Sequence, residues 1–110
     1  MAYRQVTLDD WVLERLKDRM RRASIVASRT GRPVVLYRNT IEEIDSAAEE
    51  EIATINEQYV VVQVLTHGGF IPPDLEQQRV FTYDQFADWI MNRSRDLLMQ
   101  CIENLDQEIS

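Results

Sequence analysis

The stretch Tyr59-Val-Val-Val-Gln-Val-Leu-Thr66 carries the strongest structural signal in this chain of 110 residues. It is rich in β-branched residues and too short for a typical helix, so it predicts a β-strand. Its apolar residues follow one another almost without a break, which is typical of a strand that is buried on both faces. We therefore expect residues 59–66 to form a central strand of a sheet.

Two elements are predicted upstream of this strand. Residues 33–38 (Pro-Val-Val-Leu-Tyr-Arg) are again β-branched and aromatic, which indicates a second strand. Thr40-Ile-Glu-Glu43 matches a capping box, which predicts the start of a helix. Apolar residues three or four apart then indicate a helix over residues 41–57, with an apolar stripe formed by Ile41, Ile44, Ala48, Ile52 and Ile55.

Downstream of the strand, residues 67–78 are rich in Gly and Pro and are expected to form a loop. Residues 79–81 indicate a short edge strand. Thr82-Tyr-Asp-Gln85 is another capping box, and Phe81 and Phe86 occupy the positions of a hydrophobic staple. This pattern predicts a helix over residues 83–106, which a polar stretch at residues 91–96 interrupts.

The N-terminal part of the chain predicts a further helix over residues 6–28, with Thr7 as its N-cap and Gly31 and Pro33 as its end. The expected order is α-β-α-β-(β)-α, a small sheet of two or three strands with three helices. The fold class is α/β, or α+β, in a single domain over residues 1–110. A right-handed βαβ unit with parallel strands is favoured, and antiparallel pairing is the main alternative.

Composition excludes several classes of protein. The chain has one cysteine, Cys101, so it cannot form an intramolecular disulfide, and a reducing cytoplasm suits it better than secretion. No apolar run approaches the length of about 20 residues that spans a bilayer. One Cys and one His cannot supply a structural zinc site, and no cofactor-binding motif occurs, so we expect neither a metal nor a cofactor.

Charge is distributed unevenly along the chain, which has a formal net charge of −7. Residues 1–38 hold nine basic and four acidic residues, whereas residues 39–110 hold three basic and fifteen acidic residues. Helical spacing places Arg15, Arg19 and Arg22 in one basic stripe. The same spacing places the acidic residues Glu42, Asp45 and Glu49 on one face of the predicted helix over residues 41–57.

Each charged surface has more than one interpretation. The basic and acidic parts can attract each other within one chain, or the basic helix can meet an acidic helix of a second copy and form a dimer. The basic stripe can instead bind phosphates of a nucleic acid. The acidic face can bind a basic protein, or imitate a nucleic-acid backbone and block an enzyme that handles nucleic acids.

The lone histidine marks a candidate ligand loop. His67 follows the predicted central strand directly and precedes Gly68 and Gly69, and the end of such a strand is where many α/β proteins bind ligands. No phosphate-binding or nucleophile motif accompanies the loop, and Cys101 lies on an apolar stripe where a buried, inert thiol is expected.

The sequence thus favours a non-enzymatic, cytoplasmic protein that binds other proteins through charged helical faces, as a regulator, adaptor or inhibitor. A basic protein target and self-association are the expected partners, without a membrane. The alternatives are nucleic-acid binding through residues 6–28, which is less favoured, and a small-ligand site at His67–Gly69.

Overall fold

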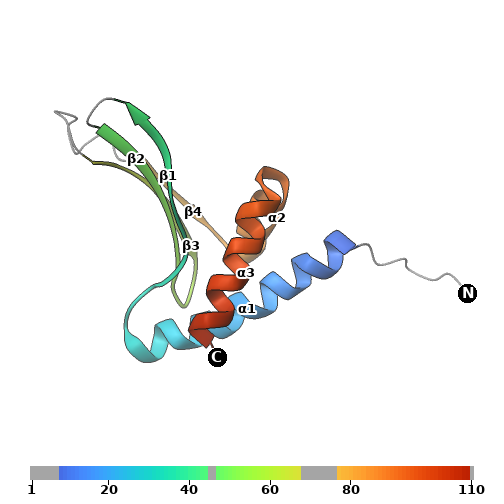
Figure 1. Cartoon of the computed structure of the whole chain (residues 1–110). Coiled ribbons are helices and arrows are strands. Elements are labelled where there is room, and N and C mark those ends of the chain that lie inside the picture. The colour runs from blue at the N-terminus through green and yellow to red at the C-terminus, as the bar shows by residue number, and fades with distance from the viewer. Residues whose placement is uncertain (1–7, 45–46, 68–76, 110) are drawn as a thin grey trace, which may run out of the picture.

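The fold class expected from the sequence is confirmed as α+β in the computed structural model, which describes residues 8–44, 47–67 and 77–109. Three helices accompany a four-stranded antiparallel sheet with strand order β1-β2-β3-β4. The elements are α1 (Leu8–Thr30), β1 (Val34–Ile44), β2 (Ala47–Ile55), β3 (Val60–His67), β4 (Gln77–Phe81), α2 (Tyr83–Arg93) and α3 (Arg95–Ile109) (Figure 1).

The predicted helix over residues 41–57 is wrong, because this stretch forms the end of β1 and the whole of β2. Its isoleucines have the spacing of a helix face, but buried and half-buried residues alternate along this stretch, as they do in a strand. Glu51, Ala53 and Ile55 are buried, and the residues between them are only half-buried. Pairing on both sides, with β1 and β3, stabilises the strand over the helix that local propensity favours.

Antiparallel pairing replaces the predicted βαβ unit. Each strand pairs with the next one along the chain, so the sheet is a meander without a crossover helix. Asn56 makes the tight turn between β2 and β3, because its side-chain oxygen accepts hydrogen bonds from the backbone N–H groups of Gln58 and Tyr59, each at 2.9 Å. The expected strands at 33–38, 59–66 and 79–81 are confirmed, and β3 is an interior strand.

Helix α1 agrees with the prediction for residues 6–28 within two residues. Gly31, directly after the last helical residue Thr30, adopts φ +70° and donates its N–H to the Ala27 carbonyl at 2.9 Å. This left-handed conformation strains residues with a side chain, so glycine is the suitable C-cap. The proposed N-cap, Thr7, lies outside the described residues.

The helix predicted over residues 83–106 is two helices, because Ser94 interrupts it. The capping box at its start is confirmed, since the Thr82 hydroxyl and the Gln85 side chain each accept a bond from the other residue's backbone N–H. Ser94 adopts an extended conformation at the end of α2, and its side chain accepts a hydrogen bond from Leu97 N–H in the first turn of α3. The polar stretch at residues 91–96 therefore marks a helix boundary.

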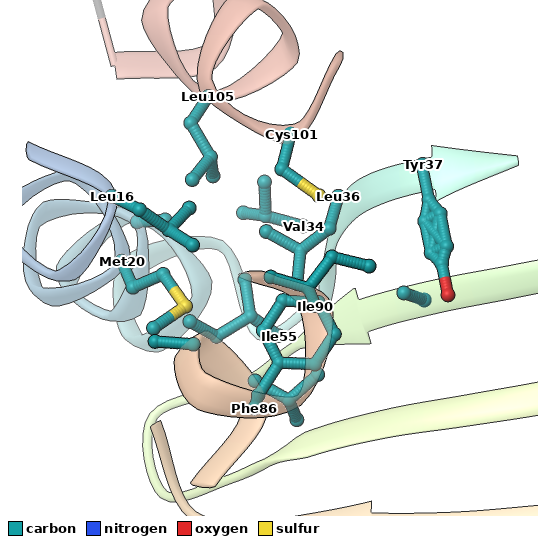
Figure 2. Packing of buried hydrophobic residues seen from close by; sticks show 14 of the residues in the cluster. Leu16, Met20, Val34, Leu36, Tyr37, Ile55, Phe86, Ile90, Cys101 and Leu105 are labelled. Carbon is teal, nitrogen blue, oxygen red and sulfur yellow. The ribbon is translucent and has the colours of Figure 1, made fainter. Parts of the chain in front are cut away.

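The core lies between the helices and one face of the sheet, which we call the inner face. Helix residues Leu16, Met20, Phe86, Ile90 and Leu105 pack against strand residues that include Val34, Leu36 and Ile55 (Figure 2). Burial of such side chains stabilises the fold by about 1.5–3 kcal/mol each. The opposite, outer face carries Val35, Thr54, Val61 and Val80, because side chains alternate along each strand.

The helices cover only part of the sheet. Figure 1 shows the β1–β2 end of the sheet extending beyond α2 and α3. Toward this end, the side-chain amides of Asn39 in β1 and Gln100 in α3 form two hydrogen bonds, at 3.1 and 3.2 Å. Within the part of the chain that the structure describes, no helix is long and apolar enough to cross a membrane.

Candidate functional site

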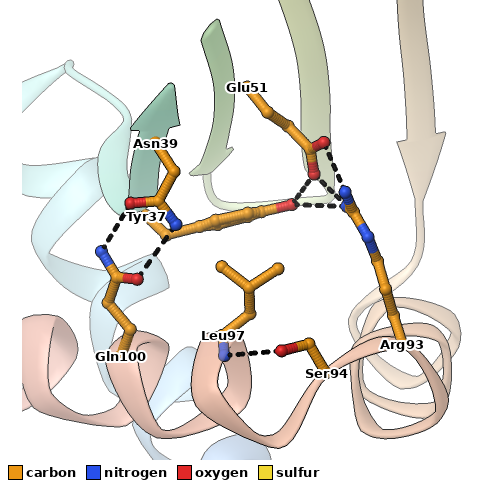
Figure 3. A network of polar contacts seen from close by, with 7 residues as sticks. All are labelled: Tyr37, Asn39, Glu51, Arg93, Ser94, Leu97 and Gln100. Carbon is orange, nitrogen blue, oxygen red and sulfur yellow. Dashed lines mark hydrogen bonds and ion pairs between the residues drawn. The ribbon is translucent and has the colours of Figure 1, made fainter. Parts of the chain in front are cut away.

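A polar cluster interrupts the apolar inner face where the helical cover ends. Register places Tyr37 of β1 beside Ala53, and Asn39 beside Glu51 of β2, so Tyr37 and Glu51 lie in adjacent rows on the same face. Arg93, the last residue of α2, reaches toward them from the helical layer (Figure 3). Three polar side chains from three elements therefore meet at one point.

Hydrogen bonds hold this cluster together. The Arg93 guanidinium donates to both carboxylate oxygens of Glu51, with Nη2 at 2.7 Å from Oε2. The Tyr37 hydroxyl donates to Glu51 Oε1 at 2.5 Å. Glu51 is only 4% exposed. A buried carboxylate is costly unless it is paired and hydrogen-bonded, and both conditions are met here.

The protonation states of the cluster are fixed near neutral pH. Burial, followed by the hydrogen bond to Glu51, raises the pKa of Tyr37, so the phenol stays protonated. Burial opposes ionisation of Glu51, but the bonds from Arg93 and Tyr37 together outweigh it and lower the pKa of its carboxyl. The hydrogen bond to Glu51 raises the pKa of Arg93. None of these groups is adjusted to exchange protons near pH 7.

A pocket of about 340 Å³ opens beside this cluster. Its lining comprises Glu51, Val62, Val64, Arg79, Trp89 and Arg93. The two valines of β3 and Trp89 of α2 supply its apolar lining. Such a combination of apolar walls with a few polar groups is typical of ligand-binding sites, and this volume is at the small end of their range.

Trp89 holds the two arginines of the pocket by cation–π contacts. The Arg93 guanidinium carbon lies 4.9 Å from the centroid of the Trp89 ring, and that of Arg79 lies 5.6 Å from it. Arg79 also lies 5.1 Å from the Phe81 centroid, and Phe81 stacks on Trp89 at 5.0 Å. The aromatic rings thus orient both guanidinium groups at the pocket.

No carboxylate lies within ion-pair distance of Arg79 among the residues whose side chains the structure describes, which are 9–40, 49–65 and 78–109. Arg93, in contrast, is neutralised by Glu51. The described pocket therefore carries one net positive charge in a chain whose formal net charge is −7. A guanidinium supplies several N–H donors in a planar fork, which matches the geometry of a carboxylate.

The acidic face predicted from helical spacing does not exist as a helical face. Glu42 and Glu49 are cross-strand partners in the β1–β2 hairpin, and Asp45 lies outside the described residues. The prediction is wrong because it assumed a helix over residues 41–57. The two glutamates are nevertheless neighbours, near the end of the sheet that the helices leave uncovered.

The basic stripe of α1 is confirmed as helical, but its charges are paired within the chain. Arg19 Nε donates to Asp106 of α3 at 2.6 Å, and Arg15 lies 3.8 Å from the same carboxylate. Arg22 pairs with Asp18 at 3.4 Å. The attraction between basic and acidic parts therefore operates within the chain, with α3 as the acidic partner of Arg15 and Arg19.

The candidate loop His67–Gly69 lies at the edge of what the structure describes. His67, which was expected directly after the strand, is the last residue of β3, whereas Gly68 and Gly69 lie outside the described residues. No group of three or more His, Cys, Asp or Glu residues within the described ranges is placed to hold a metal ion.

The pocket was not predicted from the sequence, although two of its signals are visible there. Trp89 attracts attention as a bulky aromatic residue near a helix start, and Arg93 lies in the polar interruption at residues 91–96. Glu51 could not be distinguished from the other acidic residues of the predicted helix over residues 41–57. The burial of Cys101 is confirmed, and this burial raises the pKa of its thiol to about 12.

Comparison with protein-family models, with curated proteins and with solved structures finds no significant match to this chain. The geometry of the pocket and of its charges is therefore the basis for a functional proposal.

Proposed function

We propose that this chain is a non-catalytic binding protein, a regulator or adaptor, whose inner pocket receives a carboxylate carried on an apolar group of a protein partner. The observation that carries this proposal is Arg79, which Trp89 and Phe81 orient at the pocket without a carboxylate partner among the described residues. An incoming carboxylate would pair with Arg79, as Glu51 pairs with Arg93.

The apolar part of the ligand is inferred from the rest of the lining. Val62 and Val64 offer an aliphatic wall, and the half-buried indole of Trp89 offers a flat surface. Burying an aromatic or aliphatic group there removes apolar surface from water, which favours binding by about 25 cal/mol per Å². A C-terminal carboxylate beside an apolar side chain, or an acidic side chain beside one, has this combination.

A binding role fits the pocket better than catalysis. Glu51 is already engaged by two donors, and Tyr37 is held protonated. A general acid or base works best with a pKa near the working pH, and these shifts move both groups away from it. The pocket can recognise charge and shape without transferring a proton.

The net charge of the pocket favours an acidic ligand over the basic partner expected from the supposed acidic helix. Nucleic acid is a weaker candidate, because Arg15, Arg19 and Arg22 are already paired with Asp106 and Asp18. A chain with a net charge of −7 also repels a polyanion at long range. The single buried cysteine suits a reducing compartment, so we propose the cytoplasm as the site of action.

Isothermal titration calorimetry tests the proposal with two carboxylate sources. One arm uses a short peptide that ends in phenylalanine with a free carboxylate, and the other uses free 3-phenylpropionate. The amide forms of both compounds serve as neutral controls. We expect the carboxylates to bind and the amides not to bind. Tighter binding of the peptide indicates a protein partner, whereas tighter binding of 3-phenylpropionate indicates a small metabolite.

Variants of Arg79 assign the binding to the pocket. Arg79→Gln is expected to weaken carboxylate binding about tenfold or more, because a charged hydrogen bond is lost. Arg79→Lys, which keeps the charge but lacks the planar fork, is expected to give an intermediate affinity. Arg21→Gln is the matched control, since Arg21 is an exposed arginine of α1 that does not line the pocket. Equal affinity in the Arg79→Gln and wild-type chains would refute the proposal.

A further inference from the structure

The outer face of the sheet carries a row of β-branched side chains that crosses all four strands. Val35 lies beside Thr54, Thr54 beside Val61, and Val61 beside Val80 in the antiparallel registers. Val35 is 44% exposed and Val80 is 56% exposed. Ile52 and Leu65, which are half-buried, extend this apolar surface into the next rows.

None of the described helices covers this row. The three helices bury the inner face, as the core residues Val34, Ile55, Val60 and Phe81 indicate, and Figure 1 shows them gathered on that side of the sheet. The β3 sequence is apolar on both faces, a pattern typical of strands with cover on both sides. In the described part of the chain only the inner face is packed against other elements, namely the helices.

The charge of the outer face identifies its partner. Arg38 and Glu50 lie in adjacent rows of this face and form an ion pair, so their charges cancel. The other polar residues in the rows of Val35, Ile52 and Leu65, including Gln63 and Gln78, are uncharged. A surface that meets its own copy must not repel itself, and these three neutral, largely apolar rows within a chain of net charge −7 meet this condition.

We propose that the outer face is the interface of a homodimer in which the sheets of two copies of this chain pack face to face. The β-branched rows would interdigitate as in a β-sandwich, whose sheets lie about 10 Å apart. In a twofold arrangement the arginine of one copy can also face the glutamate of the other. The inner pocket of each copy stays open on the far side, so the dimer presents two pockets.

Sedimentation equilibrium of the full chain tests this interface. The wild-type chain is expected to sediment at twice its mass of 12.9 kDa. The double variant Val35→Glu/Val80→Glu places two charges in the interface and is expected to weaken dimerisation about 100-fold or more, which leaves a monomer. Because both side chains are exposed in the single chain, circular dichroism is expected to show an unchanged fold.

A matched control separates this surface from the helices. Ile25→Glu/Met99→Glu changes two apolar helix residues that are 52% and 46% exposed, and this double variant is expected to remain dimeric. A milder double variant, Val35→Thr/Val80→Thr, keeps the strand propensity and tests the same surface if the glutamate variant does not fold. It is expected to weaken the dimer about tenfold. A wild-type monomer at about 100 µM, which is a generous concentration for a specific dimer, would overturn the proposal. The proposal would also be overturned if the variants at Val35 and Val80 remained dimeric, or if the variant at Ile25 and Met99 became monomeric.

Discussion

Glu51 of β2 and Arg93 at the end of α2 form a two-pronged ion pair that joins the sheet to the helical layer across 42 residues of sequence. The pair serves two purposes. It fixes the end of α2 over the sheet, and it neutralises one of the two arginines at the pocket. Among the described side chains that line the pocket, Arg79 is then the charged group without a carboxylate partner.

Removing the carboxylate should destabilise the fold. Glu51→Gln leaves Arg93 and Tyr37 without their ionic acceptor, and we expect the free energy of unfolding to fall by about 2–4 kcal/mol. This expected loss lies toward the low end of the range for broken buried ion pairs, because Arg93 is partly exposed. Urea unfolding measures this loss. Replacing both partners, with Glu51→Leu and Arg93→Leu, should recover part of it, because no buried charge then remains unpaired. A change below about 0.5 kcal/mol in Glu51→Gln would contradict this role.

The same carboxylate should make the fold sensitive to acid. The pKa of Glu51 is lower in the folded chain than its ordinary value of 4.5, so the folded state favours the ionised form. This contribution to stability is complete above pH 4.5 and is lost as pH falls through the lower folded pKa. Thermal unfolding of wild type and Glu51→Gln between neutral pH and pH 3 isolates the effect. The stability difference should shrink on acidification, and a constant difference would count against the ionised pair.

The structure explains which parts of the fold could be predicted from the sequence. Two local signals, the Thr82 capping box and the glycine at residue 31, predict the right helix ends, whereas the capping-box pattern at residues 40–43 lies within β1. Residues 41–57 fail because their isoleucine spacing and many glutamates favour a local helix, while pairing with β1 and β3 decides the outcome. The turn at Asn56 is the missed local signal. The pocket joins β2, β3, β4 and α2, and no single stretch of sequence reports such a meeting.

The capping box at the start of α2 should contribute measurably to stability. Thr82→Ala removes the hydroxyl that accepts the Gln85 N–H, and we expect a loss of about 1 kcal/mol. Thr82→Ser keeps the hydroxyl and should remain close to wild type. Chemical denaturation of the two variants provides the comparison. Equal stabilities for the alanine and serine variants would show that the cap contributes little.

Cys101 should be unreactive in the folded chain. Its side chain is buried among apolar residues, and burial raises the pKa of the thiol to about 12, so little thiolate forms near pH 8. A chromogenic disulfide reagent should react only after a denaturant is added. Complete reaction of the native protein within the mixing time would place this cysteine at an accessible site instead.

The most direct test of the account is the fluorescence of Trp89 during ligand binding. Trp11→Phe leaves Trp89 as the only tryptophan, and Trp89 lines the pocket. Titration with 3-phenylpropionate or the phenylalanine-ended peptide should shift its emission in a saturable way, and Arg79→Gln should abolish the shift at the same concentrations. Emission that does not respond to either carboxylate, or responds equally with and without Arg79, would contradict a carboxylate-binding pocket.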